Sequence, residues 1–342
     1  MRISQVAPPW IAVPPVGYGG IEWVVSLLAD GLADRDHDVT LFATGDSSTR
    51  ARLEFAFETA PGPPHINSIW HDTVHTLRAF RDPSRYDLYH VHSAWSALAA
   101  GVVAGVPVVV TLHGSFSPEM RRLFREVGDG VRFVAISEAQ RAGMPNLPYA
   151  GVVHNGIDLE RYPLCVEKED FLLFLGRAAP EKGLLRAILA ARKAGLSLKA
   201  AVKVAHHDEV EHWRDQIEPL LGDDVEVLHE VPHGAKVDLL RRARALLFPI
   251  DWEEPFGLVM AEAMACGTPV VATPRGAVPE VVVDGETGFI VPVEEYPEAA
   301  ARRLADLWSI EPKVCRERVE RLFSQEAMVR GYERAYRTVL AG

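Results

Sequence analysis

Two cations lie close together in a glycine-flanked segment near the middle of the chain. The segment reads Gly176-Arg177-Ala178-Ala179-Pro180-Glu181-Lys182-Gly183 and separates an apolar run from a helical pattern. A guanidinium group binds phosphate oxygens as a bidentate fork, and an ammonium group acts on them as a point charge. Arg177 and Lys182 therefore suit a diphosphate, although a solvated charge pair is the simpler alternative. The spacing of the segment is not that of a Walker motif, which argues against a nucleotide triphosphatase.

Two carboxylates, Glu254 and Glu262, lie in a second informative segment. Pro255 and Gly257 indicate the start of a helix, and Gly267 indicates its end. Glu262 falls within this helix among small apolar residues, where a carboxylate is costly unless it is paired or accepts hydrogen bonds from hydroxyls. Ribose or sugar hydroxyls could supply those bonds. The start of the helix, at Phe256–Leu258, could hold a phosphate or a leaving group.

Weaker signals come from glycines and histidines at other predicted strand ends. Gly19 and Gly20 precede a helix in the segment 17–22, where glycine lets backbone N–H groups approach an anion. His113 follows a strongly apolar strand and is expected to face the ligand crevice, with a structural histidine as the alternative. The segment His154-Asn155-Gly156-Ile157-Asp158 predicts a turn.

These residues are positioned by alternating strands and helices. The predicted strands of the first half cover residues 3–7, 39–43, 88–92, 106–112, 133–136 and 152–154. Those of the second half cover residues 171–175, 198–204, 225–228, 245–249 and 269–272. The clearest helices are expected over 20–34, 184–194, 209–220 and 324–340. Continuous apolar strands alternating with helices predict doubly wound parallel sheets, whose ligands bind at the carboxyl ends of the strands.

Composition narrows the class of protein. The chain has 342 residues, 48% hydrophobic and 24% charged, with a formal net charge of −11. This length predicts two domains, and the acidic balance without a basic stripe argues against a nucleic-acid partner. Three cysteines give neither a disulfide framework nor a metal-binding spacing. Neither a signal peptide nor a membrane-length apolar run is found, so a cytoplasmic protein is expected.

Taken in order, these motifs resemble those of the family-four retaining glycosyltransferases of GT-B fold. The resemblance depends on Glu254-x7-Glu262, the cationic segment 176–183, the turn 155–158 and Asp284-Gly285-x-Thr287-Gly288. It implies an α/β protein with two Rossmann-like doubly wound domains facing across a cleft. Residues 1–160 would form the acceptor-side domain, and residues 161–323 would form the nucleotide-sugar domain. The last helix, within 324–342, would cross back to the first domain.

The resemblance also implies a role for each candidate residue. Arg177 and Lys182 would neutralise the donor diphosphate, which Gly19 and Gly20 would approach, and Glu262 would bind the ribose. The element that contacts the sugar would consist of Glu254 with Phe256, Gly257 and Leu258, and His113 would lie near the transferred sugar. Members of this family retain the anomeric configuration and use no divalent metal. No metal site and no cofactor beyond the nucleotide-sugar co-substrate are expected.

Departures from the family pattern bear on the donor and the acceptor. The segments 202–208 and 228–233 lack the glycines that are usual near the nucleobase, which leaves the identity of the base open. UDP is the first expectation, and dTDP and GDP are alternatives. The acceptor is expected to be a soluble natural product or an oligosaccharide. The cluster of Arg121, Arg122 and Arg125 does not by itself favour membrane association. The sugar, the linkage and the oligomeric state stay open at this point.

Other functions would require different residues at these positions. A nucleotide-sugar epimerase or a glycosyl phosphorylase of similar architecture is the main alternative. A nicotinamide oxidoreductase would need Gly-x-Gly-x-x-Gly directly after the first strand and an acidic residue after the second, where the chain reads Phe42-Ala43-Thr44-Gly45. A non-catalytic sugar-nucleotide-binding module would be expected to lose the cations or Glu254, and all of these are present.

Overall fold

The chain folds into two compact units. The computed structural model describes residues 1–17, 19–92, 95–127, 130–204 and 207–342. Unit 1 comprises Met1–Ile157 and Ser324–Gly342, and unit 2 comprises Asp158–Phe323, whereas the sequence analysis set the boundary after residue 160. Tyr18 of the predicted glycine loop, and Ala205 and His206 of the segment linked to the nucleobase, lie outside the described residues.

Unit 1 is built on a parallel sheet in the order β3-β2-β1-β4-β5-β6-β7. Its strands are β1 (Arg2–Val6), β2 (Asp38–Ala43), β3 (Arg52–Phe55), β4 (Leu88–His92), β5 (Val108–Leu112), β6 (Arg132–Ala135) and β7 (Tyr149–Val152). The strand order reverses between β1 and β4. In open parallel sheets, such a reversal marks the place where ligands bind outside the carboxyl ends of the strands.

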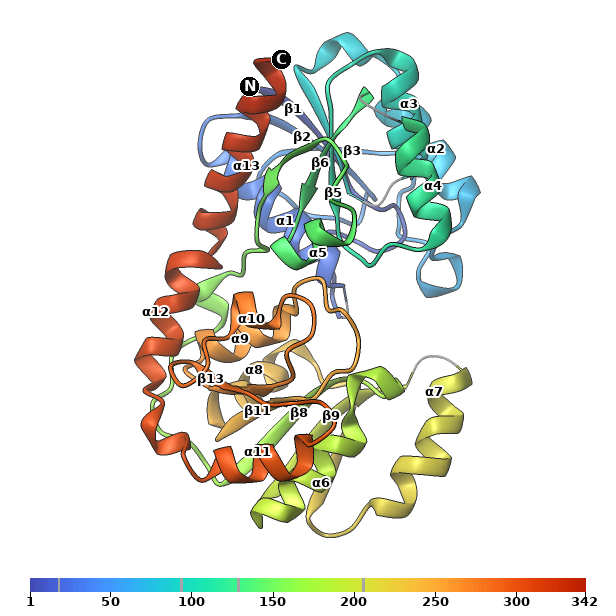
Figure 1. Ribbon diagram of the computed structural model, residues 1–342. Helices are drawn as coiled ribbons and strands as arrows, with labels where there is room; N and C mark the ends of the chain where they lie inside the picture. The colour runs from blue at the N-terminus through green and yellow to red at the C-terminus, as the bar shows by residue number, and fades with distance from the viewer. Residues whose placement is uncertain (18, 93–94, 128–129, 205–206) are drawn as a thin grey trace. The chain divides into compact units, whose positions relative to one another are not determined.

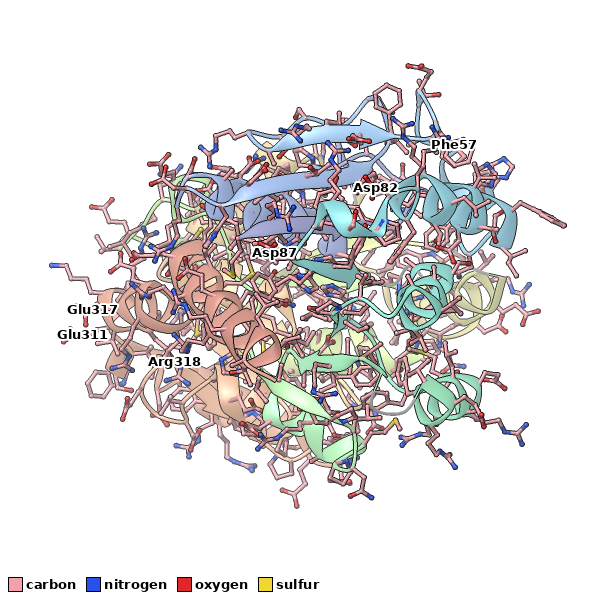
Figure 2. All side chains as sticks on the ribbon, turned by 90° about the horizontal axis from the view of Figure 1, so that it is seen from above. Phe57, Asp82, Asp87, Glu311, Glu317 and Arg318 are labelled. Atoms are coloured by element: carbon pink, nitrogen blue, oxygen red, sulfur yellow. The ribbon has the colours of Figure 1, made fainter. Side chains whose placement is uncertain are left out.

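The strands of this sheet are buried along their whole length at its centre. Every residue of β4 and of β5 is buried, which requires helices on both faces of the sheet. The beginning of β1 is fixed by Asp87, which is labelled in Figure 2 and accepts bonds from the backbone and side chain of Arg2 at 2.7–3.0 Å.

Unit 2 is built on a second parallel sheet in the order β10-β9-β8-β11-β12-β13. Its strands are β8 (Phe171–Arg177), β9 (Ser197–Lys203), β10 (Val225–His229), β11 (Ala245–Phe248), β12 (Val270–Ala272) and β13 (Gly288–Ile290). Here the order reverses between β8 and β11. The two sheets confirm the prediction of two Rossmann-like α/β domains.

Helices connect the strands of both units. In unit 1 they are α1 (Gly20–Ala33), α2 (Ile69–Ala79), α3 (Trp95–Ala104), α4 (Pro118–Val127), α5 (Glu138–Gly143) and α13 (Gln325–Leu340). In unit 2 they are α6 (Leu184–Ala194), α7 (His207–His212), α8 (His233–Arg242), α9 (Leu258–Ala265), α10 (Val278–Val281), α11 (Tyr296–Leu304) and α12 (Pro312–Leu322). Arg318 of α12, labelled in Figure 2, donates to the carbonyls of Glu280 and Val281 at the end of α10.

The last helix, α13, belongs to unit 1, as the sequence predicted. It packs against α1 and β7, and Figure 1 shows it lying alongside the strands of unit 1, with the two termini close together. Ser324 caps its beginning by accepting a bond from the backbone of Ala327 at 3.2 Å. On its inner face, Tyr332 and Tyr336 are fully buried.

Two elements differ from the sequence prediction. The segment expected as a helix over 209–220 is helical throughout but is not a single α-helix: α7 ends at His212, and a π-helical segment over Trp213–Ile217 and a 3₁₀ turn over Glu218–Leu220 follow. Pro219 has no N–H to continue the helix. The sequence also missed β3, an edge strand in which no residue is fully buried and which therefore shows no apolar run. None of the described helices is long and apolar enough to span a membrane.

Candidate functional site

Arg177 and Lys182 lie at the two ends of one turn in unit 2. Arg177 is the last residue of β8, and Lys182 ends a short 3₁₀ turn that leads into α6. Gly183 follows with a φ of 78°, and a Cβ there would lie 2.1 Å from the carbonyl oxygen of Pro249. Only glycine therefore allows this turn to pack against the loop that follows β11.

Both cations are bonded to carboxylates. Arg177 donates to Glu209 of α7, whose side chain is fully buried, and to Glu181 at 3.3 Å. The Lys182 Nζ lies 2.9 Å from Glu254 Oε2 and 4.3 Å from the centre of the Trp252 ring. The sequence missed Glu209 because this residue comes from a separate helix and no local pattern marks it. Phosphate oxygens that entered this turn would compete with these carboxylates for the cations.

The loop after β11 holds Glu254 in place. The Asp251 N–H donates to the carbonyl of Glu181 at 2.8 Å, and the Ala277 N–H donates to the carbonyl of Glu254 at 2.8 Å. The loop is therefore tied to the cationic turn on one side and to the start of α10 on the other. The Glu254 side chain remains 12% exposed beside Lys182.

Glu262 lies on α9 with two partners that the sequence analysis missed. Its Oε1 accepts hydrogen bonds from Tyr162 Oη at 2.6 Å and from Lys236 Nζ at 2.8 Å. Burial alone would raise the pKa of Glu262, but the charge and the hydrogen bonds of Lys236, with the bond from Tyr162, lower it. Among the described residues, both hydrogen bonds end on Oε1, which leaves Oε2 for an added hydroxyl.

At the beginning of α9, backbone groups rather than side chains are available to bind a ligand. Gly257, with a φ of 81°, is the N-cap, and Leu258 is the first helical residue. The Phe256 side chain is 1% exposed and packs edge-on against Phe323, with the ring centres 5.5 Å apart. Phe256 was predicted to contact the sugar. Because its side chain is buried, only its backbone groups could make that contact. The first N–H groups of a helix lack partners within the helix and can bind an anion.

Gly19 and Gly20 begin α1 in unit 1. Gly19 is the N-cap, and a Cβ at this position would lie 2.8 Å from both Glu22 Oε2 and Pro15 Cβ. The loop is thus tightly packed against Glu22, and burial raises the pKa of this carboxyl group.

His113 lies directly after β5 in unit 1, beside His92, which ends the neighbouring strand β4. The two rings are joined by a contact of 2.9 Å between His113 Nε2 and His92 Nδ1. Burial lowers the pKa of His113 to about 3, so the ring is neutral at pH 7. The chain has thirteen histidines, and no sequence pattern predicts that these two are paired.

Two of the motifs that carry the family resemblance have structural roles. The turn 155–158 supports the start of α13, where Gly156 N lies 3.1 Å from Met328 Sδ and the Gln325 N–H donates to the carbonyl of Ile157 at 3.0 Å. In the segment 284–288, Thr287 and Asp284 side chains accept backbone bonds that set the start of β13.

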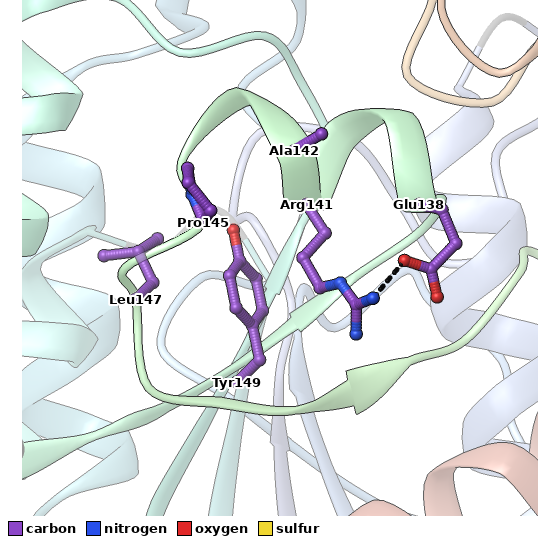
Figure 3. Close-up of a pocket in the computed structure, with 6 residues that line it drawn as sticks. All are labelled: Glu138, Arg141, Ala142, Pro145, Leu147 and Tyr149. Atoms are coloured by element: carbon purple, nitrogen blue, oxygen red, sulfur yellow. Dashed lines mark ion pairs between the residues drawn. The ribbon is translucent and has the colours of Figure 1, made fainter.

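A pocket elsewhere in unit 1 contains none of the predicted site residues. It has a volume of about 560 Å³ and is lined by Glu138, Arg141, Ala142, Pro145, Leu147 and Tyr149 (Figure 3). Glu138 and Arg141 form an ion pair of 2.5 Å across its wall. No group of histidine, cysteine and acidic residues placed to hold a metal ion occurs in the part of the chain that the structure describes.

Two family models match the chain in succession. The model described as Glycosyltransferase Family 4 matches residues 18–161, and the model described as Glycosyl transferases group 1 matches residues 160–322. Together they span both units.

Individual proteins with known names are similar over most of the chain. A phosphatidyl-myo-inositol mannosyltransferase of Mycobacterium tuberculosis is 29% identical, over 97% of this chain and 93% of that protein. A D-inositol 3-phosphate glycosyltransferase of Saccharomonospora viridis is 30% identical, over 83% of this chain and 80% of that protein. The crystal structure of AviGT4, a glycosyltransferase involved in avilamycin A biosynthesis, is 30% identical with a TM-score of 0.75, over 99% of this chain and 98% of that one.

Proposed function

The chain belongs to glycosyltransferase family 4, and we propose that it transfers a hexose-type sugar from a nucleoside diphosphate sugar to a hydroxyl acceptor with retention of the anomeric configuration. The observation that carries this proposal is the cluster of Arg177, Lys182 and Glu254 in unit 2. These residues gather where β8 and β11 meet, at the reversal of strand order. Ligands of parallel sheets bind at such a reversal.

In this proposal, the two cations help the nucleoside diphosphate to leave. When the bond between the anomeric carbon and the β-phosphate oxygen breaks, the electron pair stays on the phosphate. Arg177 and Lys182 stabilise that growing charge, which is greatest in the transition state. For this to happen, the diphosphate takes the place of Glu254 at Lys182 and of Glu181 at Arg177. In unit 2, the backbone N–H group of Leu258 offers a further donor, and in unit 1 the N–H groups of Gly19 and Gly20 are the proposed donors.

Glu262 binds the ribose in this proposal. Its Oε1 is held by Lys236 and Tyr162, so the carboxylate is kept ionised and fixed in direction. Its Oε2 can then accept a hydrogen bond from a ribose hydroxyl. Hydrogen bonds to a charged acceptor are stronger than neutral ones, which makes this contact selective for the nucleotide's sugar.

Glu254 and His113 act on the transferred sugar. Both offer hydrogen-bond acceptors that suit sugar hydroxyls, and Gly257 and Leu258 offer backbone groups. The acceptor hydroxyl forms its bond to the anomeric carbon on the face that the phosphate leaves, and its proton passes to the leaving phosphate oxygen. Because side-chain cations neutralise the diphosphate, the proposed step uses no metal ion.

UDP is the proposed nucleotide, with dTDP and GDP as alternatives. The named relatives suggest two acceptor classes for the test. Two of them are inositol-directed enzymes by name, and the third takes part in making a natural product. A soluble hydroxyl acceptor of the natural-product or saccharide class is proposed here, in the cytoplasm.

The test is release of nucleoside diphosphate from UDP-glucose, dTDP-glucose and GDP-mannose, each with myo-inositol, inositol phosphate or an oligosaccharide as acceptor. We expect release with one donor, dependent on an acceptor and retained in EDTA, and lost in Lys182→Met. Release that requires inorganic phosphate would favour a glycosyl phosphorylase. Conversion of a donor into another nucleotide sugar, without release, would favour an epimerase.

A further inference from the structure

Buried polar side chains form a hydrogen-bonded path from His113 into the core of unit 1. His92 Nδ1 lies 2.9 Å from His113 Nε2, and on its other side His92 Nε2 lies 2.7 Å from Gln5 Oε1. Gln5, in β1, donates from Nε2 to Tyr336 Oη of α13 at 3.0 Å. Gln5, His92 and Tyr336 are fully buried, so each bond replaces one that water would otherwise make.

The hydrogen-bonded path continues from Tyr336 through β4 and β5 and returns to α13. Tyr336 Oη lies 2.7 Å from His90 Nδ1, and His90 Nε2 lies 2.7 Å from Thr111 Oγ1. Thr111 Oγ1 in turn lies 2.9 Å from Tyr332 Oη. Strands β1, β4 and β5 and helix α13 thus share one hydrogen-bonded path, and its outer end is His113.

The donors along this path determine where the histidine protons reside. The Gln5 carbonyl oxygen can only accept, so His92 carries its proton on Nε2. Burial first, and then the neighbouring His90 and His113, hold the pKa of His92 well below its usual value, so His92 is neutral and its Nδ1 is an acceptor. His113 must therefore donate to it from Nε2. Being neutral as well, His113 has no proton on Nδ1.

We propose that Gln5, His92 and Tyr336 are positioning residues that hold His113 in its Nε2–H tautomer and so present Nδ1 as an unprotonated hydrogen-bond acceptor. Among the described residues, no hydrogen bond to His113 Nδ1 is found. The tautomer of His113 is thereby set by α13, through a path of side chains that do not themselves contact the ligand.

The tautomer limits what His113 can contact, an argument that rests on the proposed function. A bare ring nitrogen accepts a bond from a hydroxyl but repels a phosphate oxygen, which has no proton to give. His113 thus recognises a hydroxyl of the transferred sugar rather than the diphosphate. Turning the Gln5 amide around would reverse every donor along the path and place the proton on Nδ1.

The test is a two-bond proton–nitrogen correlation spectrum of the whole protein with nitrogen-15 in its histidine rings, at pH 7. The His113 signals are assigned by their loss in His113→Asn. We expect Nδ1 to be the unprotonated nitrogen in the wild type. In Tyr336→Phe and Gln5→Met, we expect the tautomer ratio to change by about tenfold or more toward Nδ1–H, as loss of a buried hydrogen bond allows.

Two controls separate positioning from general damage. Tyr89→Phe removes another buried phenol of unit 1, whose contacts to the Ala79 and Asp82 carbonyls are long at 3.5 and 3.4 Å, and it should leave the tautomer unchanged. Gln5→Glu still offers His92 an acceptor oxygen and should keep His113 protonated on Nε2.

A wild-type His113 protonated on Nδ1 or on both nitrogens would overturn the proposal, as would an unchanged tautomer in both Tyr336→Phe and Gln5→Met. Calorimetry with UDP reports separately on unit 2. Absence of UDP binding would remove the proposed function and leave the tautomer assignment standing.

Discussion

Arg177 binds two carboxylates at the point where the donor diphosphate is proposed to bind. Its bonds to Glu209 and Glu181 fix the guanidinium group in the turn, and the buried Glu209 cannot follow a ligand outward. Glu181 is more exposed and can be displaced. The arginine is therefore held in place by one carboxylate while the other gives way to phosphate.

Replacing Arg177 by alanine should weaken UDP binding by about tenfold to a hundredfold, since a hydrogen bond to a charged group contributes about 1.5–3 kcal/mol. Isothermal titration calorimetry measures this effect. Arg244→Ala is the matched control, because Arg244 of unit 2 pairs only with the exposed Asp170 among the described residues. Equal affinity of Arg177→Ala and Arg244→Ala would refute the role of Arg177.

Glu262 gives a sharper test, because either the carboxylate of the protein or the ribose hydroxyls of the nucleotide can be removed. UDP should bind the wild type about tenfold more tightly than 2′,3′-dideoxy-UDP, and Glu262→Gln should reduce this preference. The measurement is a competition titration with both nucleotides. A preference that survives in Glu262→Gln would show that the ribose is recognised elsewhere. Glu280→Gln, in α10, serves as the control for loss of a carboxylate in unit 2.

The sequence identified the site residues that lie beside turn signals. It missed their hydrogen-bond partners, which come from distant parts of the chain. Arg177, Lys182 and Glu254 stand next to glycines and prolines at strand ends, where local chemistry is readable. Lys236 and Tyr162 reach Glu262 from other elements, and only the folded chain brings them within 2.8 Å of it. Long-range pairing leaves no local periodicity by which it could be found.

At the scale of elements, α13 is tied to the end of α1 by an ion-pair cluster. Glu333 accepts bonds from Arg35 Nε at 2.9 Å and from His37 Nε2 at 3.1 Å. The hydrogen bond from Arg35 is the main cause that lowers the pKa of Glu333 to about 2, and His37 adds to it. The same helix supplies Tyr332 and Tyr336, so its attachment also maintains the path to His113.

This cluster predicts a specific loss of stability in acid. Because the pKa of Glu333 is lower in the folded state than its usual value of 4.5, its contribution is complete above about pH 4.5 and is lost as the pH falls toward 2. Arg35 is 41% exposed, so solvent screening makes this contribution smaller than that of a buried ion pair.

Thermal unfolding of the wild type and of Glu333→Gln measures this contribution. The variant should unfold several degrees lower at pH 7, and the difference should shrink as the pH falls toward 3. A constant difference across this range would contradict the assignment. Glu326→Gln, an exposed position on the same helix, should behave like the wild type at both pH values.

At the scale of the whole molecule, the fold was largely predictable and its edges were not. The central strands β1, β4, β5, β8 and β11 are largely buried because both of their faces are covered, and the sequence identified all of them. The edge strand β3 was missed, and the helix over 209–220 was predicted without its change of hydrogen-bond pattern after His212. Their residues are partly exposed, so tertiary contacts rather than apolar periodicity decide their structure.

Each unit has its own sheet with its own reversal of strand order, and the predicted site residues are divided between them. Arg177, Lys182, Glu254 and Glu262 belong to unit 2, whereas Gly19, Gly20 and His113 belong to unit 1. Recognition of the nucleotide is therefore assigned mainly to unit 2.

The most direct test of the account is a thermal-shift screen of the whole protein with UDP, dTDP, GDP and ADP in the presence of EDTA. A ligand that binds the folded state raises the unfolding temperature by mass action. The account predicts a shift with one base, UDP first, and no comparable shift with the corresponding nucleoside. If no diphosphate shifts the transition, or if a shift appears only after a divalent ion is added, the proposed donor site is contradicted.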